Sequence, residues 1–168
     1  MIKLTFDTNI LRDYLCPDRE HHTHAVALVR LDEEGVCEIR VVSRLTEDVP
    51  EGDLRRRLDE LAICQRPRIG TIAEWDVSDW DADFWATDEE EKLYARLFEL
   101  IFPSVDRNSK NQSSRAADVG HLLGHMRARR DIFVTRDGPI LNRNNELMSH
   151  FGIIVMTSAD ALRYCETK

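Results

Sequence analysis

The sequence predicts a single α/β domain, residues 1–168, in which a mostly parallel sheet is flanked by helices. Short apolar segments alternate along the chain with longer amphipathic segments, as in sheets whose strands are joined by helices. The segments IFV at 132–134 and IIVM at 153–156 are continuous apolar runs, typical of strands buried on both faces. The chain has 168 residues, enough for one domain with a sizeable core.

The first half of the chain contains two expected strands and two expected helices. Residues 2–6, IKLTF, alternate apolar and polar side chains and are expected to form the first strand. A helix is expected from about residue 18 to 34, where apolar residues recur at helical spacing before Gly35. CEIRVVS, 37–43, is the second expected strand. EGDLRRRLDELAI, 51–63, is expected to form a helix capped by Asp53.

The second half alternates in the same way. A helix is expected to begin at Thr87, which forms a capping-box pattern with Glu90, and to end before Pro103. Another is expected from the serine pair at 113–114 to about residue 130. The remaining expected elements are a strand at 131–135, a strand at 152–157 and a short last helix from 158, with Asp160 in its first turn.

The charge of the chain is concentrated in one segment. The formal net charge is −8, but residues 74–91 hold nine of the 31 acids and no Lys or Arg, so the remainder is nearly neutral. Net charge alone therefore does not exclude a nucleic-acid partner. This segment lies in an atypical middle region, about 50–112, with Trp75, Trp80 and Trp85. It is interpreted as a solvated flap with tryptophans packed on the core, or as a surface that shields the site or docks a partner.

The sequence contains no membrane signal. No apolar run approaches the roughly 20 residues that span a bilayer, and Asp7 and Arg12 interrupt the apolar N-terminus, so no membrane partner and a cytoplasmic location are expected. Cys16 lies close to a histidine cluster at 21–24, which is either a metal cluster or a polar helix start.

Acidic residues follow the expected strands at what should be one edge of the sheet. Asp7 follows the first strand directly, Glu47 comes shortly after the second, and Asp137 follows the third. Asp118 lies in the first turns of a helix that leads into the third strand and runs antiparallel to it. Ligands of open α/β sheets bind outside the carboxyl ends of the strands. Four distant segments are therefore expected to bring carboxylates together.

Carboxylates gathered in this way require a cation. Like charges raise one another's pKa, and a bound Mg²⁺ or Mn²⁺ relieves the repulsion because both prefer carboxylate and water oxygens. Such a site suits phosphodiester hydrolysis by metal-activated water. Thr135 or Arg136 could contact a phosphate oxygen, and Gly138 lets the chain turn away. A single Asp after a strand is usually a turn or cap residue, and Asp118 could simply favour the helix dipole, so the interpretation depends on all four acids together.

An ordered set of motifs resembles the PIN-domain (PilT N-terminal) ribonucleases, including VapC-like toxins. The motifs are FDTNIL, SRLTED, SSRAADVGHLLGHM, FVTRDGPIL and GIIVMTSADAL. The resemblance implies a three-layer PIN-like fold and a Mg²⁺- or Mn²⁺-dependent endoribonuclease acting on RNA. It also implies a homodimer and, for toxin members, a small antitoxin protein as partner.

The resemblance also assigns roles to residues of this chain. Asp7, Asp118 and Asp137 resemble the metal-binding catalytic acids. Glu47 resembles the fourth such acid, with Asp48 as a less favoured substitute. The polar residues that resemble the family's supporting positions are Thr8, Asn9 and Thr135.

Two other functions fit parts of the sequence. A catalytically inactive PIN-like module that binds RNA or protein fits the acidic middle region. A phosphotransferase with Asp7 as nucleophile would carry a second Asp two residues on, where this chain has Asn9. His125 and Arg129 share a helical strip with Asp118, so they either contact substrate phosphate or are flanking polar residues.

Overall fold

The structure is a computed structural model, and it describes residues 1–43, 52–71, 84–105 and 113–168. These ranges contain a four-stranded sheet in which every strand runs parallel to its neighbours, in the order β2-β1-β3-β4. The strands are β1 Ile2–Phe6, β2 Cys37–Val41, β3 Ile132–Val134 and β4 Ile154–Met156. The expected α/β class, with a parallel sheet flanked by helices, is confirmed.

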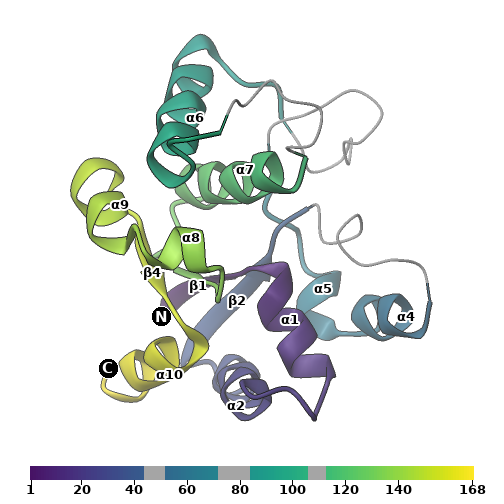
Figure 1. Cartoon of the computed structure of the whole chain (residues 1–168). Coiled ribbons are helices and arrows are strands. Elements are labelled where there is room, and N and C mark those ends of the chain that lie inside the picture. The colour runs from purple at the N-terminus through teal and green to yellow at the C-terminus, as the bar shows by residue number, and fades with distance from the viewer. Residues whose placement is uncertain (44–51, 72–83, 106–112) are drawn as a thin grey trace.

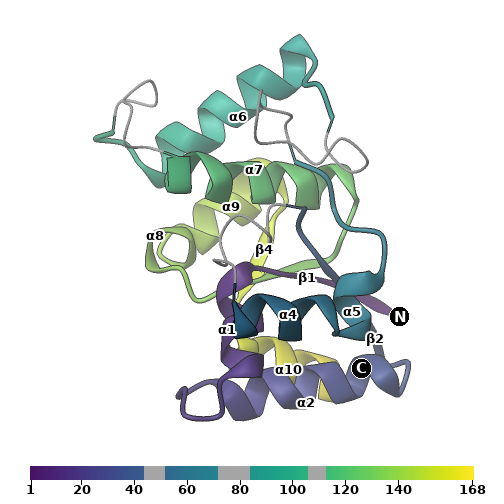
Figure 2. The same cartoon turned by 90° about the vertical axis from the view of Figure 1, so that its right-hand side faces the viewer.

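Helices cover both faces of the sheet and produce three layers (Figures 1 and 2). One outer layer contains α1, α2 and α10, with α4 and α5 beside it, and the other contains α6, α7, α8 and α9. The helix bounds are α1 Thr8–Leu15, α2 His22–Glu33, α4 Asp53–Asp59, α5 Ala62–Gln65, α6 Asp88–Ile101, α7 Ser113–Arg127, α8 Gly138–Leu141, α9 Asn144–Phe151 and α10 Ser158–Glu166. No helix in the described ranges is both long enough and apolar enough to cross a bilayer.

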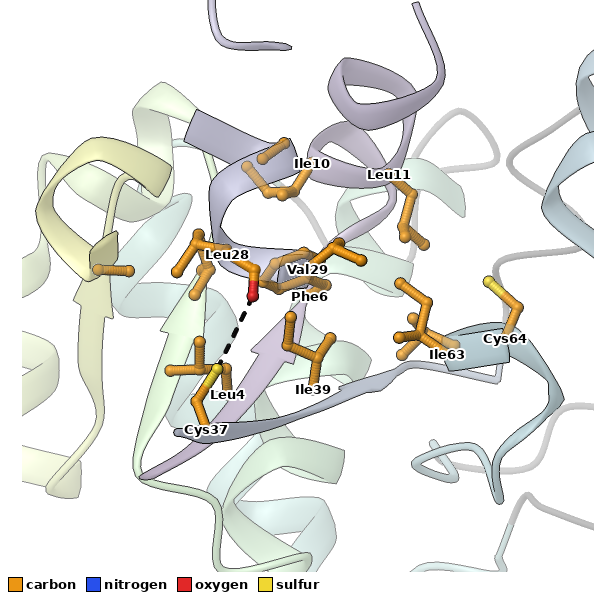
Figure 3. Packing of buried hydrophobic residues seen from close by; sticks show 14 of the residues in the cluster. Leu4, Phe6, Ile10, Leu11, Leu28, Val29, Cys37, Ile39, Ile63 and Cys64 are labelled. Atoms are coloured by element: carbon orange, nitrogen blue, oxygen red, sulfur yellow. Dashed lines mark hydrogen bonds between the residues drawn. The ribbon is translucent and has the colours of Figure 1, made fainter. Parts of the chain in front are cut away.

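The first face of the sheet is packed by apolar side chains from both halves of the chain. Leu4 and Phe6 of β1 are completely buried against Leu28 of α2 and Ile10 of α1 (Figure 3). The Cys37 thiol donates to the Leu28 carbonyl at 3.9 Å, which joins β2 to α2. Burial of each large apolar side chain contributes about 1.5–3 kcal/mol, so this cluster fixes how α1 leaves the end of β1.

The second face is packed by a separate apolar cluster around α7. Val119 and Leu122 of α7 contact Phe133 of β3, and Leu97 of α6 and Leu147 of α9 complete the cluster. Because α7 is held on the sheet by these residues, the polar side chains beside them on α7 are also brought to the sheet.

The central strand β1 presents polar side chains to α7. Thr5 is fully buried, and its hydroxyl oxygen lies 2.8 Å from Nδ1 of His125. The Arg130 guanidinium donates to the Leu4 carbonyl at 2.8 Å, and the His121 ring lies beside Asp7. Residue numbers therefore fall along α7 as they rise along β1, so the helix is antiparallel to the strand. The N-terminal half of α7 consequently points toward the carboxyl edge of the sheet.

Several expected boundaries are confirmed, and others need correction. The capping box at Thr87 and Glu90 is present, and Asp160 lies in the first turn of α10, where its backbone N–H is accepted by Thr157. Asp53 is not the cap of α4, because Gly52 occupies the cap position and Asp53 is the first helical residue. The helices α1, α8 and α9 were not expected, and Trp85 is 57% exposed, so this tryptophan is not packed in the core.

The segment before the acidic region lies against the middle of α7. Ile69 continues the sheet edge through a parallel bridge to Val42, and its carbonyl accepts from the Ser43 N–H at 2.9 Å. The next residue, Gly70, lies so close to α7 that a Cβ added at Gly124 would be 2.3 Å from the Gly70 carbonyl oxygen. Gly124 is therefore required for this close approach of two backbones.

Gly124→Ala should destabilise the fold, whereas Gly120→Ala in the same helix should not. The Gly124 substitution forces two backbones apart, which costs about 1–3 kcal/mol, while a Cβ at Gly120 meets its nearest atom at 3.7 Å. Gly120→Ala should be neutral or stabilising by up to about 1 kcal/mol, because alanine favours helix. Urea unfolding of both variants measures this difference, and equal stabilities would contradict the close approach.

The stability of the fold should fall on acidification because of His125. Burial and, to a smaller extent, the charge of Arg130 lower the pKa of His125 to about 4. Between about pH 6.5 and pH 4 the unfolded chain binds a proton at this position that the native chain does not, so stability falls with pH. The loss should reach about 3 kcal/mol.

The matched variant is His125→Gln, which keeps a hydrogen-bonding group beside Thr5 but does not titrate. The free energy of unfolding of this variant, measured from pH 7.5 to pH 4, should change less than that of the wild type. Parallel pH profiles for the two proteins would show that His125 is not the titrating group.

Candidate functional site

The site lies where the strand order reverses at the middle of the sheet. The chain passes from β1 to β2 on one side and from β3 to β4 on the other, so β1 and β3 flank the switch point. Ligands of open α/β sheets bind at this point, outside the carboxyl ends of the strands. Asp7 directly follows β1, and Thr135, Arg136 and Asp137 follow β3. The Asp7 N–H donates to the Val134 carbonyl at 3.1 Å, which aligns the two exits.

The Asp7 carboxylate is buried and surrounded by donors. It is 4% exposed and is the N-cap of α1, where its Oδ1 accepts from the Thr8 N–H at 2.8 Å. Its Oδ2 accepts from the Asn9 amide and the Thr135 hydroxyl, each at 2.6 Å. The predicted supporting residues Thr8, Asn9 and Thr135 therefore all contact the first acid.

These donors keep Asp7 ionised. Burial alone would raise the pKa of Asp7, but the His121 ring, the Thr135 hydroxyl and the Thr8 N–H outweigh burial, and the pKa lies below its usual value. The three donors Thr8, Asn9 and Thr135 lower the nucleophilicity of this carboxylate, while Oδ1, which takes only the Thr8 N–H of these three, keeps an acceptor site for a cation. This geometry argues against the phosphotransferase alternative, which needs Asp7 free to attack.

Thr135 links the two strand exits. Its hydroxyl donates to Asp7 and accepts from the Asn9 amide and from the Asp137 N–H, both at 3.0 Å. Asn9 in turn accepts from the Arg136 N–H at 3.2 Å. Because Thr135 is fully buried and its hydroxyl is used in this way, it positions the acids, and Arg136 remains the candidate for phosphate contact.

Asp137 lies near enough to Asp7 for the charge of Asp7 to raise its pKa. It is half-buried, and its Oδ1 accepts from the Ile140 N–H at 3.1 Å, which makes Asp137 the N-cap of α8. Burial raises its pKa, the Ile140 N–H partly offsets this, and the Asp7 charge raises the pKa further. Gly138 therefore begins a short helix and does not simply turn the chain away. The negative charge of Asp7 therefore disfavours ionisation of Asp137.

Asp118 lies on α7 at the same edge. It precedes His121 by three residues, so the two lie on one side of the helix about one turn apart. His121 lies beside Asp7, and α7 runs antiparallel to β1, so Asp118 is further toward the carboxyl edge than His121. Asp118 is half-buried. The predicted acids Glu47 and its substitute Asp48 lie outside the described residues.

Two residues of the site were not singled out from the sequence. Asp13 of α1 is fully buried and pairs with Arg19, and its Oδ2 lies 3.5 Å from Nε of Arg136. His121 Nδ1 lies 3.6 Å from Oδ1 of Asp7. Of the strip predicted to flank Asp118, His125 is buried against Thr5, and Arg129 lies beyond the end of α7.

A surface cavity of about 370 Å³ opens beside the acids. Its lining residues are Asn9, His21, Arg136, Asp137 and Gly138. It therefore offers a carboxylate and a guanidinium to the same ligand. A larger cavity of about 450 Å³ lies between α6 and α9 and shares none of these residues.

The donor set suits a hard divalent cation. Asp7 and Asp137 are carboxylates at two strand exits, and Asp118 is a carboxylate one turn before His121 on α7. Within the described ranges, no three His, Cys, Asp or Glu side chains are already gathered around one point as a preformed metal site.

Thr135→Val should destabilise the protein more than Thr5→Val. Both threonines are fully buried on the sheet, and valine matches threonine in shape. The Thr135 hydroxyl serves an ionised carboxylate, a bond worth about 1.5–3 kcal/mol, whereas that of Thr5 meets a histidine ring, worth about 1 kcal/mol. Chemical denaturation ranks the two variants, and an equal or smaller loss for Thr135→Val would refute its role in holding Asp7.

Comparison with known proteins finds no family model and no curated protein that matches this sequence. The function is therefore inferred from the geometry of the site itself.

Proposed function

We propose that the protein is a Mg²⁺- or Mn²⁺-dependent endoribonuclease of PIN-like type that hydrolyses RNA phosphodiester bonds. The observation that supports this most is the pairing of Asp7 and Asp137 at the switch point. Their segments are far apart in the sequence, yet Thr135 hydrogen-bonds to both, and the charge of one acid raises the pKa of the other.

The proposed roles follow from the environment of each acid. Asp7 is ionised and fixed in position, so it would anchor the cation. Asp137 caps α8 through Oδ1, which leaves Oδ2 for the cation. Asp118 on α7 is proposed as the third acid. When bound, the cation would neutralise these charges and activate a water for attack on phosphorus. Glu47 is proposed as the fourth acid on the resemblance alone.

Arg136 is the proposed contact for substrate phosphate. Its side chain is 39% exposed and lines the cavity beside Asp137, and the buried Asp13 carboxylate holds its Nε at 3.5 Å. A guanidinium held by one acid keeps other N–H donors for a phosphate oxygen. This supports an anionic substrate despite the net charge of −8.

The proposal also includes two kinds of protein partner. A homodimer and neutralisation by a small antitoxin protein are proposed because the motifs resemble toxin members of the PIN-domain family. The cytoplasmic location expected from the sequence is also part of the proposal.

The alternative is a catalytically inactive PIN-like module that binds RNA or protein. Two observations favour it: the described acids are not already gathered as a metal site, and nine acids occupy residues 74–91. Calorimetry separates the two functions, because a folded protein that takes up no Mn²⁺ at millimolar concentration would be the inactive module.

Asp118→Asn should lower the rate of single-stranded RNA cleavage by at least about 100-fold, as expected when a charge that stabilises the reaction is removed. Cleavage by the wild type should require Mn²⁺ or Mg²⁺ and stop with EDTA. The matched control is Asp131→Asn at the opposite edge of the sheet, where the side chain accepts from the Lys3 N–H at 2.7 Å and an amide oxygen can do the same.

The Asp131→Asn protein should cleave as fast as the wild type. Circular dichroism of both variants checks that each is folded. Cleavage by folded Asp118→Asn at the wild-type rate would show that the acids are not the active site.

A further inference from the structure

His121 is buried beside Asp7 without a hydrogen-bond partner. Its side chain is 1% exposed, and neither ring nitrogen has a hydrogen-bond partner among the residues that the structure describes. Buried polar atoms are almost always paired, because leaving them unpaired costs their full desolvation. An imidazole with both nitrogens unpaired at the candidate site therefore indicates a position where a ligand binds.

His125 shows that a buried histidine on α7 can have a hydrogen-bond partner. His125 lies one turn further along the same helix and is equally buried, but its Nδ1 lies 2.8 Å from the Thr5 hydroxyl oxygen. No comparable hydroxyl serves His121 within the described ranges. The unpaired ring is specific to the position beside the carboxylate.

The spacing between His121 and Asp7 is within ion-pair range but longer than a hydrogen bond. Nδ1 and Oδ1 are 3.6 Å apart, too far for a hydrogen bond. Two donors bound to one cation at about 2.1–2.2 Å lie roughly 3–3.5 Å apart. The observed separation is close to this range, so a small movement places both atoms on one ion.

We propose that His121 is a nitrogen ligand of the cation, together with Asp7 and Asp118. This rests on the proposed metal site and adds to it the class of metal. Asp118 and His121 are three residues apart, so consecutive turns of α7 supply an oxygen and a nitrogen donor. Imidazole suits borderline transition cations, whereas Mg²⁺ prefers oxygen. The site therefore selects Mn²⁺, or a similar transition cation, over Mg²⁺.

Pulsed electron paramagnetic resonance of Mn²⁺ bound to the full chain tests the proposal. The wild type should show coupling of Mn²⁺ to ¹⁴N, and His121→Gln should lose it. Calorimetry of His121→Gln should show Mn²⁺ affinity at least about 10-fold weaker, by analogy with the loss of a group that orients a ligand, and Mg²⁺ affinity changed less than about threefold. His150→Gln, in the exposed part of α9, is the matched control and should keep the coupling.

The outcomes separate this inference from the proposed function. A wild-type Mn²⁺ spectrum without nitrogen coupling would overturn the role of His121, as for a water bridging it to Asp7, and leave an all-oxygen metal site in place. A wild type that binds neither Mn²⁺ nor Mg²⁺ at millimolar concentration would overturn both. The wild-type spectrum decides the matter even if His121→Gln fails to fold, and His121→Asn provides a second variant.

Discussion

The buried charge of Asp7 is the constraint on which the rest of the site depends. A carboxylate that is 4% exposed at the end of a central strand is costly unless donors surround it. The chain provides them from both sides of the switch point: Thr8 and Asn9 begin α1, and Thr135 follows β3. Satisfying one charge therefore fixes the direction of α1, the exit of β3 and the position of Asp137. The fold and the site are held by the same hydrogen bonds.

The alternation of side chains along β1 explains how a central strand can carry such a site. Leu4 and Phe6 pack into the apolar layer beneath α1 and α2, and Thr5 and Asp7 face α7. A strand buried on both faces would normally be apolar on both. Here α7 compensates with His125 and His121 in place of apolar residues. His125 is hydrogen-bonded to Thr5 of the strand, which is a packing role. His121 has no such hydrogen bond among the described residues, which indicates a ligand site.

The sequence predicted the sheet and the neighbouring positions of Asp7 and Asp137 at the strand exits, and it failed where charged residues are buried. Parallel strands align their carboxyl ends, so Asp7 and Asp137 were expected to be neighbours once β1 and β3 were recognised. The helix α1 was missed because Asp13 interrupts its apolar side, yet Asp13 is fully buried and paired with Arg19 and Arg136. Pairs of this kind form between distant elements and leave no local pattern. The same reason hid His121, because the Asp7 carboxylate beside it lies more than 100 residues away in the sequence.

The central claim is that Asp7, Asp118 and Asp137 converge on one divalent cation. Anomalous X-ray scattering from crystals grown with Mn²⁺ tests it most directly, because the signal locates the metal independently of the protein. The account predicts an anomalous peak within about 2–2.5 Å of oxygens from these acids. A map with no peak at this edge of the sheet, in crystals where the three side chains point to separate faces, would contradict it.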